Sequence, residues 1–409
     1  MKPATLLLPA LLAAAVLLRL AAVLVLSPTI ESDGLAYVTM ARSLIADGVL
    51  RDQWGQHVFY SAGYPLLLAP AFALAGSGLA TVVAVNCALT VVSGLLVHRL
   101  VLALGGTRGA ALVAVAIFAA WLPAVWNATL PAKENLSTPL LLGLVLCALA
   151  VARGGRWTAG LGAGLCWGAG AVTGGSALLT GAALALALPF ARRSAGRGHA
   201  GRAALAFALG ALLTLGPWLV ASERMVGEAL LSTNAEFNLY LGNNPAADGR
   251  FVSIAETPAG PRWEAQRRTL GEAGASHWLG GLARAWIAAN PDEAARLALT
   301  KLALFWAPNM PDAADFAASE AIATIRLADV AQYLLVLAAA ALGLARAPIP
   351  PRDRLVVAAA IAGFWLIHAA AYVMPRYRDP VAPLLIALAA CWAWPVVSRF
   401  LTQRSVHAA

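Results

Sequence analysis

The chain has 409 residues, of which 60% are hydrophobic and only 12% are charged, and its mean hydropathy is +0.74. A soluble domain needs a charged surface, and this composition cannot supply one. The lipid bilayer must therefore be the solvent for most of the chain, and we expect an all-α membrane protein.

The net charge of +9 raises the question of a nucleic-acid partner. However, the basic residues lie in short gaps between apolar runs, as Arg192, Arg193, Arg352 and Arg354 do. Basic residues in such gaps fix the orientation of membrane proteins, because loops rich in lysine and arginine stay in the cytoplasm. The charge therefore predicts membrane topology and no binding of nucleic acid.

Apolar runs that can cross a bilayer recur along the chain. A helical span needs about 20 residues at about 1.5 Å per residue. The first run is too long for the core of a signal peptide, so we expect an uncleaved first span. About ten runs are predicted to span, at residues 4–26, 79–104, 109–127, 136–152, 157–172, 176–191, 203–222, 327–346, 355–374 and 380–400.

Two of these runs, 157–172 and 176–191, are shorter than a typical span. Arg153 and Arg156 precede the pair, and Arg192 follows it. If the basic residues on both sides are cytoplasmic, the chain between them crosses an even number of times, so the two runs form a hairpin. The same rule places both ends of the chain in the cytoplasm.

Two segments on the opposite, non-cytoplasmic face are too long to be simple connectors. The first, 27–78, contains an amphipathic stretch at 34–46 and an apolar stretch at 64–75 that is too short to cross. We expect the first stretch to be a helix that lies on the membrane and the second to be an interfacial or re-entrant helix. The second segment, about 221–326, is richer in charged residues and is predicted to form a small, mainly helical periplasmic cap.

The chain is accordingly predicted to have three regions. Loops of this size on one face usually carry function, so the candidate residues are sought on that face. The regions are an N-terminal transmembrane region at 1–220, which includes the outer loop at 27–78, the cap at 221–326, and C-terminal transmembrane helices at 327–409.

Asp33 comes just after the first span, at the start of the amphipathic stretch. A carboxylate there is able to take up a proton or hold a metal ion at the mouth of the bundle. The alternative is a helix N-cap, in which an acidic side chain accepts backbone N–H bonds and favours the helix dipole. Spacing alone favours the cap.

Lys133 and Glu134 lie in a short outer loop between the third and fourth spans. Such a loop normally avoids lysine, so Lys133 departs from the orientation rule. Either the two residues bind a ligand or they are a solvated pair of loop charges. The sequence favours neither interpretation over the other.

Two arginines, Arg376 and Arg378, crowd a short outer turn between Pro375 and Pro380. Arginine recognises phosphate through several donors in one plane. The alternative is a pair of arginines that reach to the membrane interface beside Asp379. The crowding favours an anionic lipid headgroup as the ligand.

The start of the predicted cap is rich in amide and aromatic side chains. Residues 238–245 read Asn-Leu-Tyr-Leu-Gly-Asn-Asn-Pro. Amides bond sugar hydroxyls and rings stack on sugar C–H faces, but Gly-Asn-Asn-Pro is also good turn chemistry. The sequence leaves a sugar-facing surface and a simple turn equally open.

Four segments follow one another in order on the same predicted face. They are Asp33 with Tyr37, the apolar run at 63–69, the amide-rich run at 238–245 and the arginine turn at 376–380. In this order they resemble motifs of the polyprenol-phosphate-sugar glycosyltransferases of the GT-C superfamily. The likeness is strongest to the group of protein O-mannosyltransferases and bacterial lipid A aminoarabinose transferases (glycosyltransferase family 39), and it runs through nearly the whole chain.

The resemblance implies an inverting glycosyltransferase that moves a sugar from a polyprenyl-phosphate donor to a hydroxyl of an envelope glycan, lipid or protein. Asp33 would be the general base, a role typically worth about 10²–10⁴ in rate, and Glu134 would orient Lys133 or the acceptor. Cations would stabilise the departing phosphate. The candidates for that role are Arg376, Arg378, Lys133 and Arg224.

The resemblance also places the substrates next to further side chains. It implies a bacterial cytoplasmic membrane, with the active site facing the periplasm and membrane lipids around it. The implied substrate-binding residues are Tyr37, Tyr64, Asn238, Tyr240, Asn243, Asn244 and Tyr377.

The sequence departs from the family pattern at two places. Gly34 follows Asp33 where many relatives have a second acid, so we assign no metal ligand and a divalent metal has no support. Thr173-Gly174-Gly175 stands where relatives often have Arg-Pro near the sixth span, which would alter donor contacts or weaken activity. No cofactor is expected beside the lipid-linked sugar.

Two other functions stay open. A transporter or flippase for a lipid-linked sugar would need polar groups at the membrane midplane. An inactive assembly partner of an envelope complex would keep the fold without the chemistry. Because the polar candidates gather outside the spans, the sequence favours the transferase.

Overall fold

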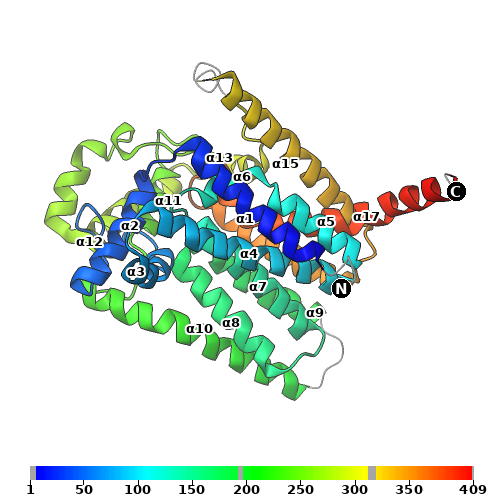
Figure 1. Ribbon diagram of the computed structural model, residues 1–409. Helices are drawn as coiled ribbons and strands as arrows, with labels where there is room; N and C mark the ends of the chain where they lie inside the picture. The colour runs from blue at the N-terminus through cyan, green and yellow to red at the C-terminus, as the bar shows by residue number, and fades with distance from the viewer. Residues whose placement is uncertain (1–5, 192–196, 312–318, 408–409) are drawn as a thin grey trace.

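The computed structural model describes residues 6–191, 197–311 and 319–407, and these ranges consist of helices and loops without a β-strand (Figure 1). One isolated backbone bridge joins Arg250 to Val373. The α-helices are, in chain order, α1 (Leu7–Leu26), α2 (Ser32–Asp47), α3 (Gly63–Ala75), α4 (Leu79–Ala103), α5 (Arg108–Ala119), α6 (Leu122–Ala128), α7 (Glu134–Ala152), α8 (Trp157–Thr173), α9 (Leu178–Ala191), α10 (Arg197–Val226), α11 (Asn234–Leu241), α12 (Gly260–Ala289), α13 (Pro291–Trp306), α15 (Glu320–Arg346), α16 (Pro351–Leu366) and α17 (Ala382–His407). The short 3₁₀ helices are η2 (Gly175–Ala177), η3 (Ile254–Glu256), η4 (Ile367–Ala369) and η5 (Pro375–Arg378).

Helices occupy all ten segments that were predicted to span the membrane. Among the described residues, α1, α4, α7, α10 and α15 are long and apolar enough to cross. α5 and α6 add a sixth span if they are counted as one helix bent by 55°. The other predicted spans coincide with α8, α9, α16 and α17, which are shorter over their described apolar parts. The chain is therefore a multi-pass membrane protein of the all-α class, as the composition predicted.

A buried arginine of the first span stabilises the break between α5 and α6. Arg19 is fully buried, and its Nη1 donates to the carbonyl of Ala119, the last residue of α5, at 3.0 Å. Pro123 follows in the first turn of α6, where it cannot continue the hydrogen-bond ladder of α5. The ionisable group thus faces the interior of the bundle, where it has a partner.

Small residues let the apolar helices approach one another closely. A Cβ atom on Gly164 of α8 would collide with the carbonyl of Phe207 in α10. A Cβ atom on Gly363 of α16 would lie 2.6 Å from the carbonyl oxygen of Leu179 in α9. Packing through glycine is typical of helices in lipid, where close backbone contact replaces the hydrophobic effect between helices. These contacts join the shorter helices to the rest of the bundle.

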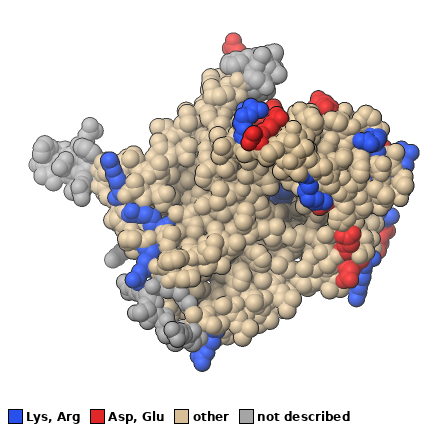
Figure 2. Space-filling model, turned by 180° about the vertical axis from the view of Figure 1, so that it is seen from behind, with Lys and Arg blue, Asp and Glu red and all other residues tan. Residues whose placement is uncertain are grey.

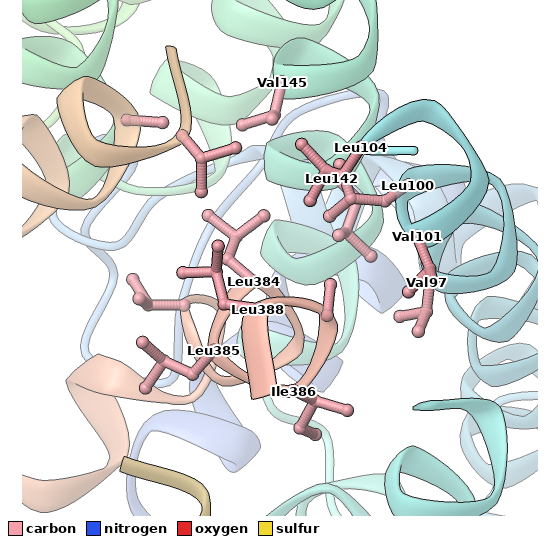
Figure 3. Packing of buried hydrophobic residues seen from close by; sticks show 14 of the residues in the cluster. Val97, Leu100, Val101, Leu104, Leu142, Val145, Leu384, Leu385, Ile386 and Leu388 are labelled. Atoms are coloured by element: carbon pink, nitrogen blue, oxygen red, sulfur yellow. The ribbon is translucent and has the colours of Figure 1, made fainter. Parts of the chain in front are cut away.

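The first turns of α17 form the centre of the bundle. Every residue from Ala382 to Cys391 is buried, and a helix that is apolar all round belongs in the interior. Figure 3 shows Leu384 and Leu388 of α17 in a core shared with Leu142 of α7 and residues of α4. The turn that carries Arg376 precedes this helix, so the core holds that turn in place.

The first outer loop and the cap lie at one end of the molecule, where Figure 1 shows α2, α3, α11 and α12 together. The predicted interfacial helices are present as α2 and α3. The cap is helical, as predicted, with α11, α12 and α13, and α12 bends at Gly271, whose φ is +70°. α15 begins at Glu320, ahead of the predicted span. The first residues of α1 and the last turns of α17 lie at the opposite end of the molecule, as the predicted topology requires.

Charge is distributed unequally between these two ends. On the face seen in Figure 2, arginines with no acidic residue beside them at the surface mark the end near α5 and α17, whereas the cap end carries both signs. This is the pattern that the orientation rule for membrane proteins leads one to expect. At the first of these ends, Arg153 pairs with the buried Asp353 at 2.7 Å and ties the α7–α8 turn to α16.

Candidate active site

Asp33 lies in the first turn of α2 and faces the last outer turn of the chain. Glu31 holds the N-cap position without a side-chain cap bond, so Asp33 is not the cap that its spacing favoured. Its Oδ2 instead accepts a hydrogen bond from Nη2 of Arg376. The two side chains are 30% and 37% exposed, which places the ion pair at an accessible surface. The positive end of the α2 dipole adds to the stabilisation of the carboxylate.

Arg376 is held between two acids on the short helix η5. Its Nη2 bonds Asp33, and its Nε lies 4.0 Å from Oε1 of the buried Glu134. Burial acts to lower the pKa of the Arg376 guanidinium, but the Glu134 and Asp33 carboxylates together raise it above its ordinary value. Arg376 is thus a permanent cation at a mouth that also holds two carboxylates.

Gly34 lets the loop before α7 pack against the start of α2. A Cβ atom at this position would lie 3.1 Å from Cγ of Pro131, tighter than an ordinary contact. Any larger side chain would push Pro131 away, and Glu134 follows in the same loop. The missing second acid of the family pattern therefore coincides with a steric restriction, because the ring of Pro131 lies against position 34.

Lys133 lies in the same loop and has no carboxylate within ion-pair distance among the described residues. A Cβ atom on Gly174 would be 3.6 Å from its Nζ, which places the ammonium at the break between α8 and α9. Here Ser176 and His368 also meet, with Oγ and Nε2 3.4 Å apart. Lys133 thus places a cation beside Thr173-Gly174-Gly175, the segment that stands where the family pattern often has Arg-Pro.

Arg378 is not brought to Asp33. Its side chain is buried, lies 4.0 Å above the ring of Tyr333, and donates to the carbonyls of Phe305 and Ala307 at the end of α13. A guanidinium with these three partners stabilises the turn, and we do not include it among the groups that face a donor phosphate.

Tyrosines form the wall behind Asp33. Tyr37 lies edge-on to Tyr60 and Tyr64, with ring centroids 5.9 Å and 5.8 Å away. Tyr64 is fully buried and donates to Oδ1 of Asn86 at 2.7 Å. Burial and the nearby Asp33 carboxylate raise the pKa of Tyr37 well above its ordinary value, so it stays a neutral phenol. Tyr60, which the sequence analysis did not select, is partly exposed and stacks on the exposed Trp54.

The amide-rich segment at 238–245 is held to the rest of the protein by a buried lysine. Lys301 of α13 is fully buried, and its ammonium donates to Oδ1 of Asn243 at 3.0 Å and to the carbonyl of Ala369 at 3.3 Å. Asn244 bonds the carbonyl of Tyr240 and so closes the end of α11. Between the two interpretations left open by the sequence, these bonds favour the turn. Burial lowers the pKa of Lys301 to about 8.

The remaining predicted residues lie at varying distances from the ion pair. Tyr240 is buried, and its hydroxyl accepts the N–H of Ala259 inside the cap. Asn238 is partly buried, and its Oδ1 has no partner among the described residues. Tyr377 stacks against His368 with ring centroids 5.4 Å apart, next to Arg376 in the chain. Arg224 is exposed near the end of α10, and no recorded contact joins it to Asp33 or Arg376 in the described part of the chain.

Glu272 ties the first outer loop to the cap, a role that the sequence analysis missed. Its two carboxylate oxygens accept the N–H groups of His57 and Val58 at 2.8 Å each, and Oε1 also accepts from Thr233 at 2.9 Å. The loop after α2 therefore has its backbone bonded to α12. No sequence signal marks this, because two of the three partners are backbone groups more than 200 positions away.

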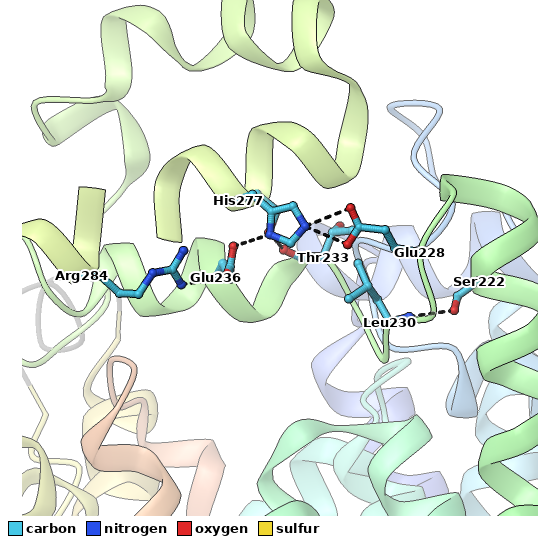
Figure 4. Close-up of polar contacts among 8 residues, drawn as sticks. Ser222, Glu228, Leu230, Thr233, Glu236, His277 and Arg284 are labelled. Atoms are coloured by element: carbon cyan, nitrogen blue, oxygen red, sulfur yellow. Dashed lines mark hydrogen bonds and ion pairs between the residues drawn. The ribbon is translucent and has the colours of Figure 1, made fainter. Parts of the chain in front are cut away.

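A second polar link holds the cap itself together (Figure 4). His277 of α12 lies between Glu236 of α11 and Glu228, 2.8 Å from each, and Arg284 bonds the other oxygen of Glu236 at 2.7 Å. Hydrogen bonds to the two carboxylates raise the pKa of His277. In the described ranges no group of three or more histidine, cysteine or acidic side chains is placed to hold a metal ion.

Comparison with known proteins identifies the fold. No protein-family model and no curated protein sequence matches the chain. Among solved structures, the apo oligosaccharyltransferase of Archaeoglobus fulgidus matches with a TM-score of 0.55 at 12% identity, over 98% of this chain and 52% of that one. The same enzyme tethered with an acceptor peptide containing the NVT sequon gives 0.56 at 13% identity, over 98% and 51%. The chain shares the fold of this oligosaccharyltransferase, which is a GT-C enzyme.

This GT-C fold is the one that the sequence resemblance implied. The chain spans about half the length of the archaeal oligosaccharyltransferase, and the low identity limits the likeness to the fold. ArnT from Cupriavidus metallidurans bound to undecaprenyl phosphate also matches, at 14% identity and a TM-score of 0.45, over 90% of this chain and 77% of that one.

Proposed function

We propose that the protein is an inverting glycosyltransferase that takes a sugar from a polyprenyl-phosphate donor and passes it to an acceptor hydroxyl at the cap end of the bundle. The observation that carries the proposal is the contact between Asp33 and Arg376: a carboxylate and a guanidinium, from opposite ends of the chain, meet at a partly exposed mouth. Lys133 supplies a further cation in the loop that also carries Glu134. The GT-C fold supports this proposal.

The ion pair gives the site a resting state. While its Oδ2 accepts a hydrogen bond from Nη2 of Arg376, the Asp33 carboxylate is engaged by the guanidinium and that oxygen is not free for a substrate hydroxyl. A phosphate group competes for the same guanidinium and can engage several of its donors in one plane. Once the phosphate takes Arg376, Oδ2 of Asp33 is free to accept a hydrogen bond from the acceptor hydroxyl. Donor binding would thus release Asp33 to act as the base.

The transfer step follows from this arrangement. Asp33 removes the proton from the acceptor hydroxyl as its oxygen forms a bond to the anomeric carbon, and the bond between that carbon and the phosphate oxygen breaks. The leaving phosphate gains negative charge, which Arg376 and Lys133 stabilise. A single displacement of this kind inverts the anomeric centre. In bacteria this proposal places the site on the periplasmic face of the cytoplasmic membrane, with an envelope lipid, glycan or protein as acceptor.

The aromatic surface near Asp33 suits a sugar. Trp54 is 53% exposed and stacks on Tyr60. Burial and the nearby Asp33 carboxylate raise the pKa of Tyr60, so its hydroxyl keeps its proton. Aromatic faces pack against the C–H faces of sugar rings, while the buried Tyr37 and Tyr64 hold the wall behind the carboxylate. We propose Tyr60 and Trp54 as sugar contacts in place of the structural residues of the amide-rich segment.

The experiment that tests the proposal incubates the purified full-length protein with polyprenyl-phosphate sugars labelled in the sugar. Transfer to an envelope extract, or slow hydrolysis that releases free polyprenyl phosphate, supports a transferase. Movement of intact labelled lipid across proteoliposomes, with no cleavage, would assign a flippase instead. Neither cleavage nor movement, together with stable capture of an envelope protein, would assign an assembly partner and reject the proposal.

A further inference from the structure

A small polar cavity lies beside Glu134 among the spans. Its volume is about 20 Å³, enough for about one water molecule. Polar groups from α4, α6, α7 and the turn before α17 line it, and a water needs two to four such partners. They include Thr90, Ser93, Asn127, Glu134, Thr138 and Asp379.

Trp121 lines the same cavity with a donor that has no partner. Its side chain is 3% exposed, and Nε1 has no hydrogen bond to any described residue. An indole N–H can only donate, so a molecule that pairs with it has to accept a hydrogen bond, as a water molecule does.

Asp379 faces this cavity with one oxygen already occupied. Oδ2 accepts Nδ2 of Asn127 at 2.7 Å. Burial raises the pKa of Asp379 to about 8 against the effects of Asn127 and Arg378, and the Glu134 and Asp329 carboxylates also raise it. These are the charged groups that influence it from α7, η5 and α15, and the amide is that of α6. The raised pKa favours the protonated carboxyl group, whose O–H is able to donate a hydrogen bond.

We propose that Asp379 is a positioning residue that works as a neutral acid: it donates to a water in this cavity, the water donates to Glu134, and Glu134 in turn holds Arg376 for the donor phosphate. The water would accept from Trp121 as well, which completes its hydrogen bonding. Loss of the Asp379 proton to bulk solvent would add a second negative charge next to Glu134. The Asp379 carboxylate would then repel Glu134 and no longer donate to the water between them, so Glu134 would hold Arg376 less well for a phosphate.

This inference rests on the proposed function for the phosphate, and the test separates the two. Binding of a short polyprenyl phosphodiester to the purified full-length protein is measured at about pH 7 and about pH 9, since a diester lacks the second ionisation near pH 6 of a monoester. For the wild type we expect Kd to rise about tenfold, because the protonated fraction of a group with a pKa of about 8 falls by about that factor.

The decisive variant is Asp379→Asn, which keeps the shape and is uncharged at every pH. We expect it to bind at about pH 9 as tightly as the wild type does at about pH 7, a gain that a merely structural role would not produce. Asp248→Asn is the matched control, because Asp248 caps an exposed turn by accepting the N–H of Arg250, as asparagine also does. It should keep the wild-type pH profile.

Asn127→Ala and infrared difference spectra test the protonation of Asp379 independently of Asp379→Asn. Asn127→Ala removes a donor that favours the ionised form, so the midpoint of the binding profile should move to higher pH. Infrared difference spectra should show a carboxylic acid band at neutral pH that disappears in alkaline buffer, with the same upward shift in Asn127→Ala.

Two results would overturn the inference: equal pH profiles for the wild type and Asp379→Asn, or no carboxylic acid band at neutral pH. If the wild type binds no diester at any pH, the proposed function fails and the donor link fails with it. An intact band in that case still supports a protonated Asp379. If the carboxylic acid band is present but the wild type and Asp379→Asn share one pH profile of binding, the protonated Asp379 stands and only its effect on phosphate binding is rejected.

Discussion

Asp33 and Arg376 are 343 positions apart in the sequence and form one ion pair at the mouth of the bundle. One residue starts α2 in the first outer loop, and the other lies on η5, which the buried start of α17 holds in place. The pair therefore forms only when the two ends of the chain have folded together.

Arg376 and Arg378 should behave differently although only one residue separates them. Arg376→Ala is expected to weaken binding of a lipid phosphate at least about tenfold with a small change in thermal stability, because it removes a charge-assisted contact at an accessible site. Arg378→Ala should instead lower stability by about 2 kcal/mol or more, since it removes the Tyr333 contact and two carbonyl bonds. Binding and thermal unfolding are measured for both. Equal effects of the two substitutions on both measurements would contradict the assignment.

Lys133 is expected to contribute to donor binding without a structural role. Lys133→Ala should raise the Kd for a polyprenyl phosphate by about tenfold, the loss of roughly one charge-assisted hydrogen bond, and leave thermal stability unchanged. Lys133→Arg should keep much of the affinity. Arg51→Ala is the control, because Arg51 is an exposed cation paired with Asp47 at the far end of α2. An unchanged Kd in Lys133→Ala would remove this residue from the site.

Glu272 should determine how firmly the first outer loop is attached to the cap. Glu272→Gln leaves one acceptor oxygen for three donors, so we expect a loss of about 1–3 kcal/mol and faster hydrogen exchange at His57 and Val58. Glu264→Gln, on the same helix but paired only with Arg267 within it, should leave exchange unchanged. Exchange at His57 that does not respond to Glu272→Gln would show that the loop is held by other contacts.

The His277 link predicts a pH dependence of cap stability. Because the pKa of His277 is raised in the folded protein, its stabilisation is complete below the ordinary value of about 6.5 and is lost as pH rises through the raised value. His277→Gln should therefore lower the melting temperature more at about pH 6 than at about pH 8.5, relative to wild type. Thermal unfolding at the two pH values is the measurement. The opposite order would mean that the charged histidine does not stabilise the cap.

Much of the fold and part of the site could be predicted from the sequence. Hydropathy located a helix at every predicted span and separated α2 and α3 as helices of the outer loop, because lipid imposes a simple rule on backbone hydrogen bonds. The division into regions at 220 and 326 stays a prediction. Arg376 could be selected because two arginines crowd one short outer turn, whereas Asp33 was selected as a base by the resemblance, since its spacing alone favoured a helix cap.

The rest of the site could not be predicted, because it depends on direction and burial. Arg376 and Arg378 look equivalent in the sequence, but on a 3₁₀ helix of three residues per turn, residues two apart point to different sides. Lys301 and Asp379 carry no sequence signal, since their chemistry comes from what surrounds them. Likewise, the reason for Gly34 appears only with Pro131 beside it.

The central claim is that Asp33 is the base and that Arg376 restrains it until the donor binds. Single-turnover transfer by Asp33→Asn, with lipid-phosphate affinity measured on the same sample and Asp47→Asn on the same helix as control, tests it most directly. We expect transfer to fall by at least about 10²-fold while the affinity is kept or increased, because Arg376 is released from its partner. Transfer at the wild-type rate in Asp33→Asn, with Asp47→Asn equally active, would contradict the account.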